Sequence, residues 1–259
     1  MIVLSIIFTL LTIIVTIVAT TAMGVPCIIA RMAGVKDRAG SIYDHVPRVW
    51  SRIMLAGAGV RVVVHNRERA HSGGAHVFVS NHMSWFDIPS LASQLPRYKF
   101  VAKAELFKVP VFGPAIRAIG MVPIERQNRK AAFEAYDAAA EKIREGNSVV
   151  VFPEGTRGED YPIRPFKKGP FVLAIASGAP IIPVLLYGTR EVLGRGSFLV
   201  RPGTVHVHLL EPIEVEGLEY NARQELAETV RARIADALRT HYGIDSAGRE
   251  VPQLVGADQ

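Results

Sequence analysis

His82 and Asp87 have residue types and a spacing that fit a general base and the carboxylate that orients it. An imidazole can take the proton of a reacting hydroxyl, while a neighbouring carboxylate fixes its tautomer and stabilises the imidazolium that forms. The spacing alone is weak, because about one chain in four with eight histidines and eight aspartates in 259 residues contains such a pair by chance. A histidine that ends a strand is also often a structural residue. The pair is therefore a candidate that needs support from its surroundings.

Three more polar groups directly follow predicted strands. They are Lys103, Arg126 and the segment 153–157, which reads Pro-Glu-Gly-Thr-Arg. In open α/β sheets, function gathers beyond the carboxyl ends of the strands. If the strands are parallel neighbours, these groups share one crevice with His82 and Asp87. Each cation taken singly is usually a surface charge, but several that converge beside a candidate base favour a phosphate pocket.

Segment 153–157 combines a turn with a cation. Gly155 can adopt a positive φ or admit a close backbone approach, and Arg157 offers a planar fork suited to phosphate or carboxylate. Taken alone, the segment is better explained as a plain turn with a solvated arginine. Lys167 and Lys168, just before a predicted helix, could extend the positive charge toward the anionic end of a long donor.

Other patterns of catalytic or metal-binding residues are absent or incomplete. The chain has no Gly-x-Ser-x-Gly elbow, no P-loop and no Gly-x-Gly-x-x-Gly. Cys27 is the only cysteine, which excludes an intrachain disulfide and a cysteine-based zinc site. His206 and His208 share one face of a predicted strand and could bind a metal, but no third ligand is evident. We interpret them as strand surface residues and expect no metal site.

The elements that must position these residues alternate between short β runs and helical stretches. Predicted strands cover 61–65, 75–80, 99–102, 121–124, 148–152, 181–187 and 204–210. Predicted helices lie near 86–94, 111–118, 129–145, 169–177 and 221–241. Strands interleaved with helices predict an α/β fold with a mixed, largely parallel sheet flanked by helices. We assign this α/β domain to residues 61–243 and a loose tail to residues 244–259.

Residues 1–60 form a predicted membrane-anchoring helical element. From Ile2 to Ala30 there is no Asp, Glu, Lys, Arg or His, and the 23 residues before Gly24 would form a helix of roughly 34 Å, enough to cross a hydrocarbon core of ~30 Å. Gly24 and Pro26 would bend or end this hydrophobic helix. No positive charge precedes the apolar run, as it would in a cleaved signal peptide. The basic residues that follow it place the carboxyl-terminal side in the cytoplasm.

A second predicted helix follows, in which apolar residues recur at helical spacing around Trp50. It is too short and too charged to span a membrane. One interpretation is an amphipathic helix that lies on the membrane with Trp50 at the level of the headgroups. The other is an ordinary helix packed on the domain. The sequence does not separate the two.

The net charge of the chain indicates which classes of partner to expect. A net charge of +6 is a mild excess, which fits an anionic partner such as a membrane surface or a phosphorylated substrate. The positive residues are scattered and form no aromatic-rich basic stripe, so we expect no nucleic-acid partner.

Four sequence blocks together resemble the glycerolipid acyltransferases of the 1-acylglycerol-3-phosphate acyltransferase type. The blocks are 81–87 (Asn-His-Met-Ser-Trp-Phe-Asp, similar to the family's His-x4-Asp block), 120–126 (Gly-Met-Val-Pro-Ile-Glu-Arg), 152–157 (Phe-Pro-Glu-Gly-Thr-Arg) and 179–184 (Ala-Pro-Ile-Ile-Pro-Val). Segments 101–103 and 166–169 are also similar to the family. The first block alone is not specific, whereas four blocks in the right order are.

The resemblance implies transfer of a fatty acyl group from acyl-CoA or acyl carrier protein to the sn-2 hydroxyl of 1-acylglycerol-3-phosphate (lysophosphatidic acid), which gives phosphatidic acid in phospholipid biosynthesis. It makes His82 the base and Asp87 its partner. It also implies a cell-membrane protein whose catalytic domain lies on the cytoplasmic face, with no cofactor other than the acyl donor. The residues that it assigns to the phosphorylated acceptor are Arg126, Glu154, Gly155, Thr156 and Arg157, with Lys103 as a further candidate.

Two alternatives stay open. Pro123 and Glu125 occupy variable positions of the second block, so the acceptor could be another lysolipid or an aminolipid. The chain could also be a non-catalytic, membrane-attached lipid-binding protein of the same fold. The His82–Asp87 pair disfavours this second alternative, because binding alone needs no base.

Overall fold

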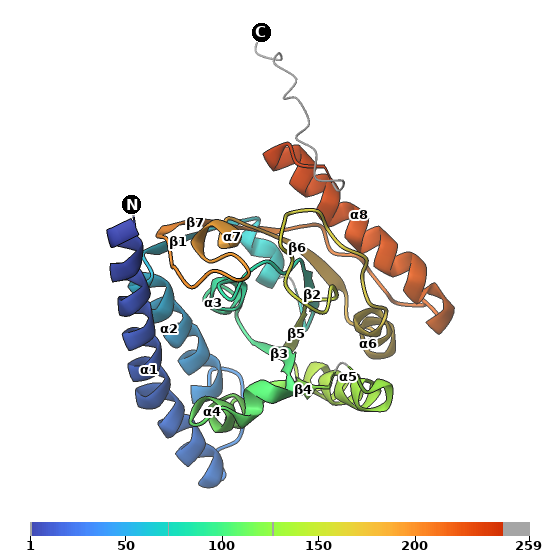
Figure 1. Cartoon of the computed structure of the whole chain (residues 1–259). Coiled ribbons are helices and arrows are strands. Elements are labelled where there is room, and N and C mark those ends of the chain that lie inside the picture. The colour runs from blue at the N-terminus through green and yellow to red at the C-terminus, as the bar shows by residue number, and fades with distance from the viewer. Residues whose placement is uncertain (1, 72, 126, 246–259) are drawn as a thin grey trace.

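The computed structural model describes residues 2–71, 73–125 and 127–245, and these form a layered α/β fold (Figure 1). Its strands pair in the order β1-β7-β6-β2-β5-β3-β4. They are β1 (Val60–His65), β2 (Val77–Ser80), β3 (Tyr98–Lys103), β4 (Val122–Ile124), β5 (Ser148–Val151), β6 (Ile181–Tyr187) and β7 (Gly203–Leu209). Their sequences are rich in valine, isoleucine and aromatic residues, which pack well on a pleated surface.

All neighbouring strands run parallel except β6 and β7, which are antiparallel. Strands β1 and β7 therefore run against the other five. This arrangement confirms the predicted mixed, largely parallel sheet, and each predicted strand overlaps an observed one.

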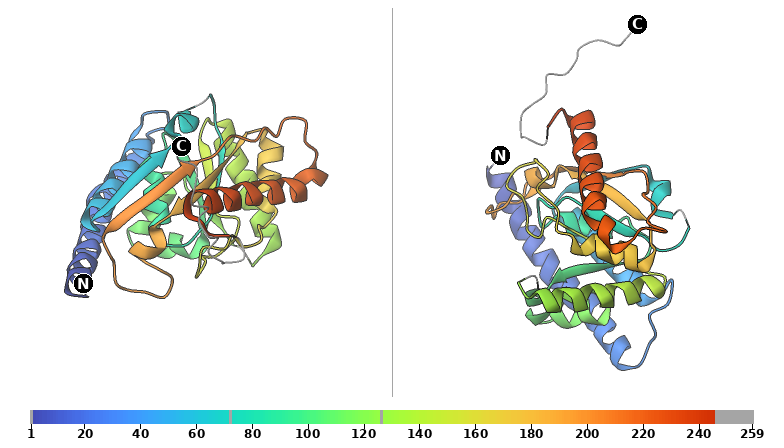
Figure 2. Two further views of the ribbon diagram at one scale, coloured as in Figure 1. Left: turned by 90° about the horizontal axis from the view of Figure 1, so that it is seen from above. Right: turned by 90° about the vertical axis from the view of Figure 1, so that its right-hand side faces the viewer.

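Helices cover both faces of the sheet. They are α1 (Ile2–Met32), α2 (Ile42–Gly57), α3 (Asp87–Ala92), α4 (Phe112–Ala118), α5 (Arg129–Arg144), α6 (Gly169–Ser177), α7 (Thr189–Val192) and α8 (Arg223–Tyr242), with short 3-10 turns at Arg67–His71, Ala104–Lys108 and Tyr220–Ala222. Val77 and Val79 of β2 pack under α5, α6 and α8, whereas Phe78 packs on the other side with residues of α2 and α3. This alternation follows from the two-residue period of a strand. Helices α1 and α8 lie on opposite sides of the molecule (Figure 2).

Helix α1 is longer than the sequence indicated, because it continues through Pro26 to Met32. Gly24 does not end it. A Cβ atom at Gly24 would lie 2.9 Å from Cβ of Ala115 in α4, so this glycine permits close packing of the two helices. Within the described residues, α1 is the one helix long and apolar enough to cross a membrane.

Helix α2 packs along α1 (Figure 1). The Trp50 indole N–H donates to Oγ1 of Thr20 at 3.0 Å, and the ring lies against Phe112 of α4 with 6.3 Å between centroids. The polar atom of Trp50 is thus bonded within the protein, and the level of this half-buried side chain relative to a membrane stays a prediction. Val49 and Ile53 are the apolar side chains that α2 exposes.

Candidate active site

His82 and Asp87 lie together at the carboxyl end of β2. The strand ends at Ser80, His82 follows in the loop, and Asp87 begins α3. His82 Nδ1 lies 2.7 Å from Asp87 Oδ2. The Asp87 side chain is fully buried, whereas the His82 side chain keeps 14% of its surface exposed. The carboxylate is thus shielded, and the imidazole can be reached from solvent.

The environment of Asp87 settles the direction of this hydrogen bond. Oδ2 also accepts from the backbone N–H groups of Met83, at 2.6 Å, and Ser84, at 2.8 Å. Because Oδ2 accepts hydrogen bonds from two amides, it acts as an acceptor toward His82 as well. Nδ1 of His82 therefore carries the hydrogen and donates it. Nε2 of His82 is then the nitrogen with the free lone pair, as a general base requires.

The imidazole is also held from the side. Its ring stacks on Phe152, directly after β5, with 4.2 Å between centroids and an angle of 21° between planes. The backbone N–H of Gly158 donates to the carbonyl oxygen of His82 at 2.7 Å. The loop after β5 therefore fixes both the ring and the backbone of His82.

Glu154 links the 153–157 segment to the base. Its Oε1 accepts the backbone N–H of His82 at 2.8 Å, and its Oε2 lies 2.8 Å from Nε of Arg164. Burial raises the pKa of Glu154, and the bonds from Arg164 and His82 offset only part of this effect. Arg164 also donates to the carbonyl oxygen of Thr156. Both carboxylate oxygens of Glu154 are thus engaged inside the protein.

Sequence reasoning did not single out Arg164. It lies between the 152–157 block and segment 166–169, in a stretch without regular secondary structure. No helical or strand pattern there indicates which side chains face the site. Its partner Glu154 lies ten positions away, which no helical or strand period predicts. The one available signal was its charge beside two blocks of the resemblance.

Gly155 occupies a position that requires glycine. Its φ is +77°, and a Cβ atom there would lie 2.7 Å from Cε of Lys167. The backbone N–H of Lys167 donates to the carbonyl oxygen of Pro153 at 2.9 Å. The chain therefore folds back on itself, and the Lys167 side chain lies directly over the turn.

Arg157 lies over the ring of Trp85, with Cζ 4.8 Å from the centroid, which is a cation–π contact. Both residues line a cleft of about 510 Å³, whose other walls include Ile13 of α1 and Met54 of α2. This cleft runs from the apolar amino-terminal helices to the loop that carries His82. It joins an apolar surface to a cation.

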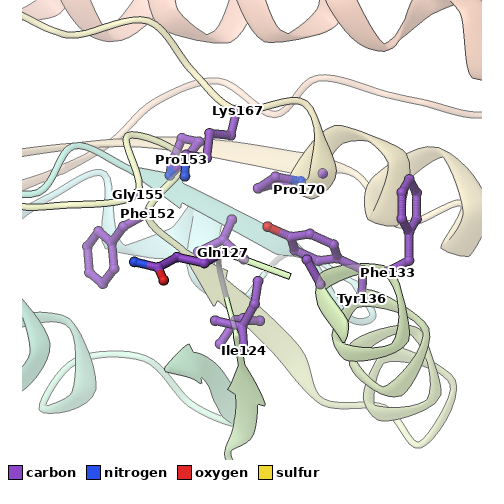
Figure 3. Close-up of a pocket in the computed structure, with 13 residues that line it drawn as sticks. Ile124, Gln127, Phe133, Tyr136, Phe152, Pro153, Gly155, Lys167 and Pro170 are labelled. Carbon is purple, nitrogen blue, oxygen red and sulfur yellow. The ribbon is translucent and has the colours of Figure 1, made fainter. Parts of the chain in front are cut away.

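A second cavity, of about 270 Å³, is lined in part by Pro153 and Gly155 of the 153–157 segment. Figure 3 shows Phe152, Pro153 and Gly155 on one side of it and Phe133 and Tyr136 of α5 on the other. Lys167 contributes a cation at its edge. Phe152 therefore stands between this cavity and the imidazole of His82.

The remaining predicted cations are placed differently. Lys103 ends β3, and its ammonium group forms an exposed pair with Glu105 at 3.1 Å. Strand β5 lies between β3 and β2. Lys103 therefore ends a strand that does not pair with β2, the strand that precedes His82. Arg126 lies outside the described residues.

The interpretation of His206 and His208 as surface residues is wrong. His208 is buried and His206 is half-buried. A third imidazole, that of His65, lies beside them because β1 pairs with β7. Only the strand order brings it there, and the sequence does not give that order.

The comparisons with known proteins point to one family. Residues 61–187 match the Acyltransferase family. The chain is 36% identical, over 164 residues, to a chloroplast 1-acyl-sn-glycerol-3-phosphate acyltransferase of Brassica napus, and this match covers 62% of the chain but 46% of the plant enzyme. It is 27% identical, over 194 residues, to a 1-acyl-sn-glycerol-3-phosphate acyltransferase of Borreliella burgdorferi, with coverage of 74% and 78%. The chain thus spans about half the length of the plant relative.

A solved structure extends the likeness to the fold. The 1-acyl-sn-glycerophosphate acyltransferase PlsC of Thermotoga maritima superposes with a TM-score of 0.75 at 26% identity, which covers 92% of this chain and 97% of that one. The sequence blocks, the loop geometry around His82 and these matches agree. The chain therefore belongs to the acyltransferase family that includes the 1-acyl-sn-glycerol-3-phosphate acyltransferases.

Proposed function

We propose that this protein transfers a fatty acyl group from acyl-CoA or acyl carrier protein to the sn-2 hydroxyl of 1-acylglycerol-3-phosphate. The observation that carries the proposal is the 2.7 Å contact between His82 Nδ1 and a buried Asp87 that is already fixed by two amides. The names of the relatives support the acceptor.

In the proposed reaction, Nε2 of His82 removes the proton of the acceptor hydroxyl as its oxygen attacks the thioester carbonyl carbon. Asp87 stabilises the imidazolium through Nδ1. The tetrahedral intermediate then collapses, the carbon–sulfur bond breaks, and the imidazolium returns the proton to the leaving thiolate. The thioester is already activated, so this route needs no acyl-enzyme.

Arg157 is the proposed anchor for the phosphate of the acceptor. Its guanidinium lies above Trp85, two residues before Asp87, at the wall of the apolar cleft beside α1. A phosphate held there leaves the acyl tail of a lysolipid in contact with the apolar walls. Glu154, by contrast, points inward to His82 and Arg164, so we assign it a positioning role and expect no direct contact with the acceptor.

Lys167 is the proposed contact for the anionic part of the donor. Its ammonium group edges the cavity of about 270 Å³ beside Gly155. The apolar lining from Phe133 and Tyr136 (Figure 3) suits a chain of methylene groups. The two cavities, each lined in part by the 153–157 segment, would then hold the acceptor and the donor.

We propose that α1 and α2 attach the protein to the cytoplasmic face of the cell membrane. Large apolar side chains of α1, among them Ile2, Leu10 and Ile17, are exposed. Both ends of α1 are nevertheless tied to the domain. Thr9 accepts from the backbone N–H of Val200, and Arg31 donates to the carbonyl oxygen of Ala118. A helix docked at both ends on the domain fits insertion into one leaflet better than a span across the bilayer.

The decisive experiment incubates the purified full chain in mixed micelles with lysophosphatidic acid and an acyl-CoA, and detects phosphatidic acid by mass. We expect product with the native protein and none above background with His82→Ala. A parallel reaction with acyl carrier protein identifies the donor. If another lysolipid or an aminolipid gives product and lysophosphatidic acid gives none, then that lipid is the acceptor instead of lysophosphatidic acid. The absence of any acyl transfer would favour the lipid-binding alternative.

The orientation is tested in membrane vesicles of both polarities. Protease added outside inverted vesicles should remove the catalytic domain, whereas right-side-out vesicles should protect it. The reverse pattern would place the site on the outer face.

A further inference from the structure

Three histidines of the strand pair β1–β7 form a cluster outside the candidate active site. His65 is the last residue of β1 and lies opposite His208 in register, and His206 stands two residues before His208 on the same face of β7. Strand β6 separates β7 from β2, which leads to His82. The cluster and the catalytic pair are therefore separate groups.

The three imidazoles are close enough to share one ligand. Nitrogen atoms of the three rings, one from each, all lie within 4.8 Å of one another. His65 Nε2 and His206 Nδ1 are 3.1 Å apart, close to the ~3.3 Å between two nitrogens of a tetrahedral zinc site with Zn–N bonds of about 2.0–2.1 Å. The rings of His65 and His208 stack with 4.0 Å between centroids.

The surroundings of the cluster resemble the outer shell of a metal site. The hydroxyl oxygen of Tyr242, at the end of α8, lies 2.7 Å from Nε2 of His208, and the ring of Tyr242 stacks on Tyr187. When Nε2–H of His208 donates to this oxygen, Nδ1 keeps the lone pair that a metal ion needs. Such bonds to a ligating histidine fix its tautomer and orientation.

We propose that His65, His206 and His208 form a binding site for one divalent metal ion that prefers nitrogen ligands, with Zn²⁺ as the representative. Three imidazoles favour zinc, copper or nickel over magnesium and calcium, which prefer oxygen. The exposed imidazole of His241 stacks on His208 with 4.4 Å between centroids, and water is the candidate for the fourth ligand.

The proposed site has a structural role. Strand β1 is at the edge of the sheet and pairs only with β7 in the described residues. An ion held by His65 of β1 and two residues of β7 would fasten this edge, and the bond from Tyr242 would connect it to the end of α8. A metal that binds the folded state and not the unfolded chain raises the thermal stability.

The test titrates Zn²⁺ into the full chain, purified without a polyhistidine tag, in detergent and stripped with a chelator. We expect uptake of one Zn²⁺ per chain, a higher melting temperature with Zn²⁺ than with Mg²⁺, and at least about tenfold weaker binding in His206→Asn. His71→Asn is the matched control, since this exposed histidine lies in the 3-10 turn after β1. His82→Ala tests the other candidate imidazole. Both control variants should bind Zn²⁺ as the native protein does.

Several outcomes would overturn the proposal. They are uptake by the native protein no greater than by His206→Asn, loss of uptake in His82→Ala, and a melting temperature that Zn²⁺ leaves unchanged. If His206→Asn does not fold, Co²⁺ bound to the native protein provides an independent test. Absorption bands of tetrahedral cobalt support the site, and the spectrum of the hydrated ion refutes it.

Discussion

The backbone N–H of His82 donates to Oε1 of Glu154 across 2.8 Å, and these two residues are 72 positions apart in the chain. The other oxygen of Glu154 is held by Arg164 at 2.8 Å. The loop after β5 thus determines where the loop after β2 places its imidazole. Precise placement of a base matters, because a displacement of about 1 Å can cost about 10²-fold in rate.

The first prediction concerns Glu154→Gln. The amide oxygen can still accept the His82 N–H, but the charge that holds Arg164 is lost. We expect turnover to fall by about tenfold, with less change in the KM for either substrate. Glu159→Gln is the matched control, because Glu159 is an exposed glutamate paired with Arg195. Steady-state kinetics check both variants, and normal turnover in Glu154→Gln would refute the positioning role.

The same variant predicts a dependence of stability on pH. Burial raises the pKa of Glu154 in the folded state above its usual 4.5. The contribution of Glu154 to stability is therefore complete below the unfolded pKa and lost as the pH rises through the folded pKa. Glutamine does not titrate, so Glu154→Gln does not lose this stability as the pH rises. The melting temperature of Glu154→Gln minus that of the native protein should therefore increase with pH above about 4.5 and then level off. A difference that shrinks over this range would contradict the assignment.

The second prediction concerns the proposed catalytic pair, His82 and Asp87. His82→Ala should lower turnover by about 10²–10⁴-fold, the usual contribution of a general base, while the protein stays folded and membrane-bound. Asp87→Asn should cause a similar loss, since the amide no longer fixes the Nδ1–H tautomer. His71→Ala is the control for loss of an imidazole elsewhere. Circular dichroism and membrane fractionation accompany the assay, and near-normal activity in folded His82→Ala would refute the mechanism.

Much of the fold could be predicted because its signals are local. The valine-rich runs that become β5 and β7 show their strand character within a few residues. No local pattern predicts the continuation of α1 past Pro26, where this helix packs on α4 and Gly24 lies close to Ala115. The order of the strands depends on pairing between distant segments, which no local pattern contains. This is why His65 was not recognised beside His208.

The candidate site divides in the same way. His82 in the loop after β2 and Asp87 at the start of α3 lie five positions apart, so their contact could be predicted from the sequence. The inward orientation of Glu154 and the part played by Arg164 could not, because each depends on how two loops meet. The stacking of His82 on Phe152 likewise joins residues that only the sheet brings together.

The third prediction concerns Arg157→Ala. Loss of a charge-assisted contact to the phosphate should raise the KM for lysophosphatidic acid by about ten- to a hundredfold, equivalent to roughly 1.5–3 kcal/mol, and leave the KM for the acyl donor unchanged. Arg157→Lys should lie between, because it keeps the charge but loses the planar fork. Arg61→Ala, at an exposed position of β1, removes the same charge elsewhere. Unchanged acceptor kinetics in Arg157→Ala would exclude this residue from the phosphate pocket.

The fourth prediction concerns a buried ion pair that ties the amino-terminal helices to the sheet. Lys99 of β3 is fully buried, with Nζ 2.8 Å from Oδ2 of Asp37 in the connection between α1 and α2. It also donates to the carbonyl oxygen of Ile119 at 2.8 Å. Lys99→Met should lower the free energy of unfolding by about 3 kcal/mol, near the lower end for a broken buried pair, because Arg97 remains 3.7 Å from Asp37.

Two further variants distinguish two causes of the expected loss in Lys99→Met: the charge of Asp37 that is left without its partner, and the packing that Lys99 provides. Asp37→Asn combined with Lys99→Met should recover part of the loss, because no charge is then left without its partner. Lys142→Met breaks a surface pair with Glu145 and should cost less than about 1 kcal/mol. Denaturant unfolding in detergent measures all three. If Lys99→Met costs no more than Lys142→Met, then the pair does not hold the helices to the sheet, and the packing of α1 on α2 and α4 must do so instead.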